Sequence, residues 1–343
     1  MVLKKDRIFY LDELRAFAII AVILCHVGMA YPVQINYLES ATVLSYISPG
    51  RIGISIFFMI SGALLINKEY ELSSFFKKRF SRVLIPAFFW KAVFLIIGLA
   101  TIGMVDYYTY ITSNLAFGWF VYGIIGVYLV IPIFNSFIKE YGLRGAEYFL
   151  LVWFIYIIII SLGYDEEGFI KYIFNSIGTY IGFAVLGYYL ANKNFKIYSN
   201  AMMIFSLIVY IACILINLHI INTYKFSFTA LSPLCVIECA SLFLFFRYAN
   251  KYAHLHPKRL FSKFHYLIEN SFIGKIIYLL SVCSYTIYLI NSPIIVYVAN
   301  SMAIQQFYLI PAVLVISTIL LLIIAVILAL IPGLNRVIGV KIR

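Results

Sequence analysis

Apolar segments long enough to cross a bilayer as helices recur along the chain, and short polar or basic stretches separate them. The longest polar stretch, near residues 248–271, is too short to form a soluble domain. We therefore predict one all-α membrane domain over residues 1–343, built as a polytopic transmembrane helical bundle. It has about ten predicted spans, at residues 9–31, 42–66, 83–105, 117–138, 147–163, 172–191, 200–221, 230–247, 272–299 and 306–331.

Composition and charge fit this prediction, because 64% of the residues are hydrophobic and 12% are charged. With the N-terminus in the cytoplasm, 21 of the 26 lysines and arginines fall in cytoplasmic segments, whereas Lys171 and Lys225 lie in outer loops. This asymmetry predicts that both termini are cytoplasmic. The net charge of +12 is then explained by orientation and by anionic membrane lipids, and no nucleic-acid partner is expected. We interpret the apolar start as a retained helix rather than a cleaved signal peptide.

Arg15 and His26 are ionisable residues eleven positions apart in the first predicted span. Eleven steps of 100° bring both side chains to one helix face, about 16 Å apart along the axis. Ionisable groups in a bilayer are costly unless they face a polar cavity or a partner. We therefore expect the pair to line a passage from the cytoplasm to mid-membrane. The alternatives are that Arg15 reaches the headgroups or pairs with Asp12, and that His26 is a hydrogen-bonded core residue.

Other polar residues in or beside the spans are candidates for function. Arg51 is expected at the depth of His26, with an interfacial arginine as the alternative. Arg79 and Arg82 have i,i+3 spacing that could hold a polyanion together, although any cytoplasmic loop of a membrane protein carries basic residues. Glu238 is a candidate buried acid or arginine partner. The five cysteines and five histidines show no metal-binding or disulfide spacing.

Five stretches carry further motifs: "RIFYLDELRAFAIIAVILCH", "GRIGISIFFMISGALL", "FFKKRFSRVLIP", "WFVYGIIGVYLVIPIF" and "CSYTIYLINSP". Together and in this order they resemble the acyltransferase-3 family of integral-membrane O-acyltransferases, over residues 8 to about 295. The resemblance adds Trp119, Tyr288 and Asn291 as candidate supporting residues. Family members often carry histidines where this chain has Phe117 and Asn291, so no catalytic role is carried over to these two positions.

The resemblance implies transfer of an acyl group, most often acetyl, from cytoplasmic acyl-CoA to a hydroxyl of an extracytoplasmic or lipid-linked carbohydrate. Acyl-CoA is then a donor substrate, and no permanently bound cofactor or metal is expected. Arg15, Arg79 and Arg82 are expected to hold the donor phosphates. His26 is expected to act as general base or as nucleophile, and Arg51 to orient it or to stabilise an oxyanion.

The main alternative is a flippase or transporter of lipid-linked sugars, which would also have many spans and a basic cytoplasmic side. Richness in Ile, Lys, Asn, Tyr and Phe indicates an AT-rich prokaryotic genome, so the expected location is a prokaryotic plasma membrane.

Overall fold

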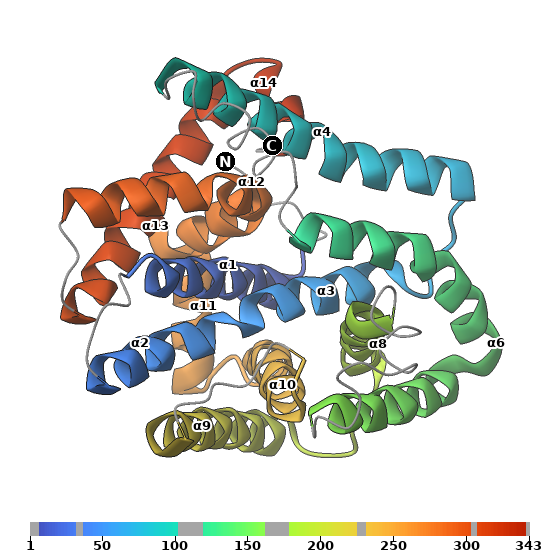
Figure 1. The fold of residues 1–343 in the computed structure, drawn as a ribbon. Helices are drawn as coiled ribbons and strands as arrows, with labels where there is room; N and C mark the ends of the chain where they lie inside the picture. Colours follow the sequence, from blue (N-terminus) through green and yellow to red (C-terminus); the bar gives the residue numbers. More distant parts are fainter. Residues whose placement is uncertain are drawn as a thin grey trace.

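The computed structural model describes residues 7–31, 37–101, 119–161, 178–224, 231–302 and 307–340, and all its regular elements in these ranges are helical (Figure 1). The all-α prediction is therefore confirmed. Phe117, Lys171, Lys225 and the basic residues of 1–6 and 341–343 lie outside the described residues. The helices are α1 (Phe9–Met29), α2 (Tyr37–Gly50), α3 (Ile52–Leu65), α4 (Leu72–Thr101), α6 (Trp119–Ser161), α8 (Gly178–Asn192), α9 (Ser199–Tyr224), α10 (Pro233–Leu255), α11 (Leu260–Asn270), α12 (Phe272–Ser301), α13 (Ile310–Leu330) and α14 (Leu334–Val337), with a 3₁₀ turn at Phe307–Leu309.

Seven of the described helical segments are long and apolar enough to cross a membrane. One of them, Thr42–Leu65, combines α2 and α3. Helix α1 carries three charged residues near its start, and α8 comprises 15 residues, so neither is among the seven. Helix α6 joins two predicted spans through Gly142, whose φ of 62° interrupts the helical path. A membrane-embedded bundle is thus supported, while ten spans and cytoplasmic termini stay predictions.

Helix α1 lies in the middle of the bundle and packs against α2, α3, α10, α12 and α13 (Figure 1). Its approach to α3 is close, because a Cβ on Gly53 would lie 2.5 Å from the carbonyl oxygen of Ala18. On the other side of α3, a Cβ on Gly62 would lie 1.7 Å from the carbonyl oxygen of Ala184 in α8. Small residues therefore allow α3 to fit between α1 and α8.

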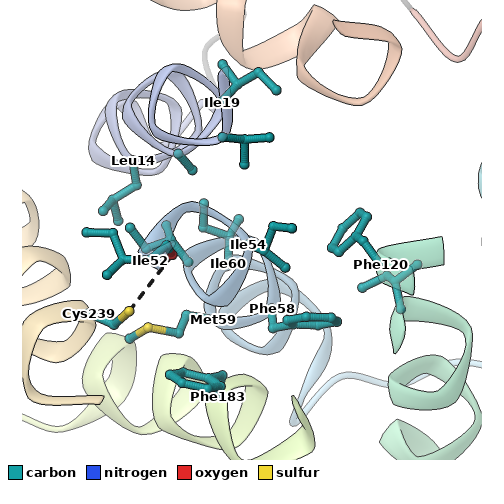
Figure 2. Packing of buried hydrophobic residues seen from close by; sticks show 14 of the residues in the cluster. Leu14, Ile19, Ile52, Ile54, Phe58, Met59, Ile60, Phe120, Phe183 and Cys239 are labelled. Atoms are coloured by element: carbon teal, nitrogen blue, oxygen red, sulfur yellow. Dashed lines mark hydrogen bonds between the residues drawn. The ribbon is translucent and has the colours of Figure 1, made fainter. Parts of the chain in front are cut away.

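Apolar side chains of α1, α6, α8 and α10 meet those of α3 in part of the core (Figure 2). Phe58 and Met59 of α3 are fully buried, and Phe183 of α8 packs beside them. The thiol of Cys239 on α10 points to the carbonyl oxygen of Ile52, 3.9 Å away. This packed core fixes α3 relative to α1 and α6, the helices that contribute to the site described next.

Candidate functional site

A cavity of about 570 Å³ lies between α1, α3, α4, α6, α12 and the residues that follow α13. Its size is typical of small-molecule sites. Four basic residues line it, and no aspartate or glutamate is among the described residues of its wall. We call it the basic cavity; its polar lining residues are Arg15, Ser61, Lys78, Arg79, Ser81, Arg82, Tyr128, Ser281, Ser284, Tyr285 and Asn335.

Helix α4 supplies Arg79 and Arg82, which are one helical turn apart and both line the cavity. The guanidinium of Arg79 lies 5.8 Å from the ring centre of Phe75, and its Nε is buried without a hydrogen-bond partner among the described residues. Arg82 is exposed. The structure thus brings together Arg15, Arg79 and Arg82, the three arginines that the sequence analysis grouped. Forked guanidinium groups of this kind suit phosphate oxygens.

Arg15 is positioned by a polar network that joins α1 to α12. Asp12 is 6% exposed and accepts hydrogen bonds from Arg7 Nε and Ser281 Oγ. Its Oδ1 lies 3.8 Å from Arg15 Nη1, in the i,i+3 geometry that the sequence allowed. The guanidinium of Arg7 also lies 4.3 Å from the ring centre of Tyr278. The network holds the N-terminal end of α1 against α12, with Arg15 on the cavity wall.

His26 and Arg51 lie at one level of the bundle, beyond the basic cavity. A Cβ on Gly50, the neighbour of Arg51, would lie 2.7 Å from the backbone nitrogen of Cys25, the neighbour of His26. The imidazole of His26 is half-buried. His26 is not among the residues that line the basic cavity. The predicted polar passage from Arg15 to His26 is therefore not one continuous cavity.

Apolar side chains lie on α1 between Arg15 and His26, and others lie in the wall of the basic cavity. Ala18, Ile19 and Val22, on the face of α1 between Arg15 and His26, are buried. The cavity wall includes Phe57 and Phe120, whose ring centres are 6.1 Å apart.

Tyr288 extends the aromatic layer formed by Phe57 and Phe120, since its ring centre lies 5.0 Å from that of Phe120. We call these three rings the aromatic partition. The neighbouring Trp119 is half exposed and stacks on Tyr180 at 5.3 Å. The Nδ2 of Asn291 donates to the backbone oxygen of Tyr288 at 2.6 Å. Asn291 is 1% exposed, and its Oδ1 has no hydrogen-bond partner in the described part of the chain.

Glu238 is placed elsewhere, on α10 and 3% exposed. It lies near Tyr210 and Cys213 of α9 and is not a wall residue of the basic cavity. The described residues contain no group of three or more histidine, cysteine or carboxylate side chains able to hold a metal ion.

Several residues of the cavity wall were not predicted from the sequence. Lys78 and Tyr128 belong to quoted motifs and could have been proposed from them. Ser281 lies in an apolar span, where a single hydroxyl is a weak signal. Asn335 and Gly339 follow the last predicted span, and nothing in their sequence indicated a place in the wall.

Comparison with known families identifies one relation. The model of the acyltransferase-3 family, described as an acyltransferase domain, matches residues 8–331, which is nearly the whole chain. Searches against curated proteins and against solved structures give no match. The chain therefore belongs to the acyltransferase-3 family of membrane acyltransferases.

Proposed function

We propose that the protein moves an acyl group, most simply acetyl, from cytoplasmic acyl-CoA to a hydroxyl of an extracytoplasmic or lipid-linked carbohydrate. The protein acts in a prokaryotic plasma membrane, with its termini and the mouth of the basic cavity facing the cytoplasm. The single observation that carries the proposal is the basic cavity of an acyltransferase-family chain, with four basic residues and no carboxylate in its described wall.

The donor phosphates bind to Arg15, Arg79 and Arg82. Coenzyme A carries a pyrophosphate and a ribose phosphate, so its nucleotide end is a polyanion that needs several cations at once. Paired guanidinium groups bind such oxygens through two parallel hydrogen bonds. The buried, unpaired Nε of Arg79 is a donor suited to this role. Asp12 holds Arg15 in place through the network to α12.

His26 supplies the base for the transfer. An alcohol loses its proton too reluctantly to attack a thioester unaided, so a neutral imidazole removes the proton as the oxygen attacks the carbonyl carbon. The tetrahedral intermediate then collapses, the carbon–sulfur bond breaks, and the imidazolium returns the proton to the departing thiolate. Arg51, at the level of His26, stabilises the developing oxyanion. We favour this direct transfer over an acyl-histidine intermediate, which would appear as label retained on the protein.

The reactive end of the donor must pass the aromatic partition to reach His26. Phe57 and Phe120 lie in the cavity wall, and on this proposal their rings change rotamer during each cycle to let the thioester pass. Tyr288 and Trp119 border the same region, and the side-chain oxygen of Asn291 nearby has no hydrogen-bond partner among the described residues. The carbohydrate hydroxyl approaches from the outer side of this layer.

Radiolabelled acetyl-CoA supplied to membranes that contain the acceptor glycan tests the proposal. We expect His26→Ala to abolish glycan labelling while coenzyme A still binds, because the basic cavity is left intact. His219→Ala, which changes an exposed histidine of α9, is the matched control and should label normally. Full labelling by His26→Ala at normal expression would discard the mechanism. Mass spectrometry of surface glycans from a deletion strain would identify the acceptor through the lost acyl substituent.

A further inference from the structure

The residues after α13 fold back onto the bundle and complete the wall of the basic cavity. We call Leu334–Val340 the C-terminal strap; it begins with α14, which packs against α4 and α13. Asn335 and Gly339 line the same cavity as Arg15, Arg79 and Arg82. The match to the acyltransferase-3 family ends at residue 331, so the strap lies outside the matched region.

Specific contacts fix the strap in this position. Thr286 Oγ1 of α12 donates a hydrogen bond to the carbonyl oxygen of Ile338. The side chains of Ile338 and Val340 are fully buried, although they follow the last predicted span. Tyr285, one residue before Thr286, donates its hydroxyl to the carbonyl oxygen of Val83 on α4 at 2.8 Å. A hydrogen bond thus joins α4 and α12 where the strap crosses them. The strap is held by specific contacts and forms an ordered part of the cavity wall.

Gly339 lies close to α4 in the strap. Its φ is +85°, a left-handed conformation that favours glycine. A Cβ there would lie 2.9 Å from Pro86 Cγ and 3.4 Å from Tyr285 Cδ1. The strap can therefore sit this close to α4 only because the residue is glycine.

We propose that the C-terminal strap is part of the donor site and that the Asn335 carboxamide binds a phosphate of the acyl-CoA donor. This inference rests on the proposed function, because it needs a coenzyme A donor. The amide Nδ2 donates to a phosphate oxygen held by Arg79 and Arg82, on the helix against which α14 packs. A neutral carboxamide adds a hydrogen-bond donor without changing the net charge of the cavity, which is set by its basic residues.

Equilibrium binding of coenzyme A to the purified full-length protein in nanodiscs tests the role of Asn335. Removing one hydrogen bond to a charged phosphate in Asn335→Ala should raise Kd about tenfold. Asn335→Asp keeps the shape but places a negative charge beside the phosphates, so it should weaken binding more than alanine does. A purely structural role predicts the reverse order, because aspartate preserves the packing. Asn270→Ala, at the exposed end of α11, is the control and should bind normally.

A matched pair of glycine variants tests the position of the strap independently. Gly333 and Gly339 both have a φ of +85°, so alanine strains the backbone at both positions. Nothing lies within 4 Å of a Cβ on Gly333, whereas Gly339→Ala must push the strap away from Pro86. We expect Gly339→Ala to weaken coenzyme A binding several-fold more than Gly333→Ala, at equal thermal unfolding midpoints.

The outcomes separate this inference from the proposed function. Suppose that the wild-type protein binds coenzyme A and that Arg79→Ala weakens this binding. If both Asn335 variants and Gly339→Ala then bind as the wild type does, the result overturns the role of the strap and leaves the proposed function standing. Wild-type protein that does not bind coenzyme A overturns the proposed function, and the role of the strap with it. If Asn335→Ala weakens coenzyme A binding and Asn335→Asp weakens it further, the result supports both the role of the strap and the proposed function.

Discussion

Replacing Asp12 with alanine should destabilise the protein strongly, because it removes a carboxylate that accepts two hydrogen bonds and faces Arg15. Arg7 and Ser281 donate hydrogen bonds to this carboxylate, and Arg15 lies 3.8 Å from it. The side chain of Arg7 is only 14% exposed, and its Nη2 is buried without a hydrogen-bond partner among the described residues. The substitution therefore leaves a largely buried cation without its counter-charge.

The magnitude follows from the burial of the partners. Removing one member of a buried ion pair costs about 3 to 5 kcal/mol. Arg15 keeps 31% of its side chain exposed, so water compensates much of its loss. We therefore expect Asp12→Ala to lower the free energy of unfolding by about 3 kcal/mol, the low end of that range. We also expect weaker coenzyme A binding, since Arg15 loses its anchor at the cavity wall.

Reversible unfolding in mixed micelles, followed by circular dichroism, measures the stability effect. Glu69→Ala is the matched control, because this carboxylate is 93% exposed and pairs with Lys139 at 3.5 Å on the surface. An exposed pair contributes about 0 to 1 kcal/mol, so the control should unfold almost as the wild type does. A double-mutant cycle between Asp12→Ala and Ser281→Ala should show a coupling energy above about 0.5 kcal/mol. Equal stability of Asp12→Ala and Glu69→Ala would refute the reasoning.

Three further predictions test packing, phosphate recognition and pH response. Gly62→Ala should lower the free energy of unfolding by about 3 kcal/mol, because the added Cβ would overlap a backbone carbonyl of α8. Gly126→Ala is the control and should leave the stability unchanged, because nothing lies within 4 Å of its Cβ. Unfolding in mixed micelles measures the stability of both variants. Arg79→Lys keeps the positive charge but removes the paired guanidinium donors, so calorimetry should show about tenfold weaker coenzyme A binding. An unchanged affinity would contradict bidentate contact between Arg79 and a phosphate. Hydrogen bonds from Ser74 lower the pKa of Glu71, so the stabilisation that this carboxylate gives to the first turn of α4 should be lost as pH falls through the lowered pKa. Amide hydrogen exchange of the first turn should become faster at low pH. Glu71→Gln should remove this pH dependence.

The helical class and the grouping of the arginines could be predicted because both follow from local information. Apolar runs of this length favour helices, and the bounds predicted at residues 9–31 agree closely with helix α1 at Phe9–Met29. The charge bias predicts that basic residues gather at one membrane face, and Arg15, Arg79 and Arg82 do line one cavity.

What could not be predicted depends on contacts between distant segments. Helical periodicity placed Arg15 and His26 on one face, but it could not show that α3 packs over the stretch between them at Gly53. The partnership of Asp12 with Ser281 joins two spans that are far apart in the sequence. Gly142 was not recognised as the joint that merges two predicted spans into α6, because one glycine in a polar connection is a weak signal.

The wall of the basic cavity is assembled from both ends of the chain, and this has a consequence for biogenesis. Arg15 enters the membrane with the first helix, whereas Asn335 follows α13. During synthesis, the nascent chain must therefore wait until α12 and α13 have been inserted before the pocket can close. A partly made protein would therefore have an incomplete cavity wall, and under the proposed function it would bind the acyl-CoA donor more weakly than the finished protein.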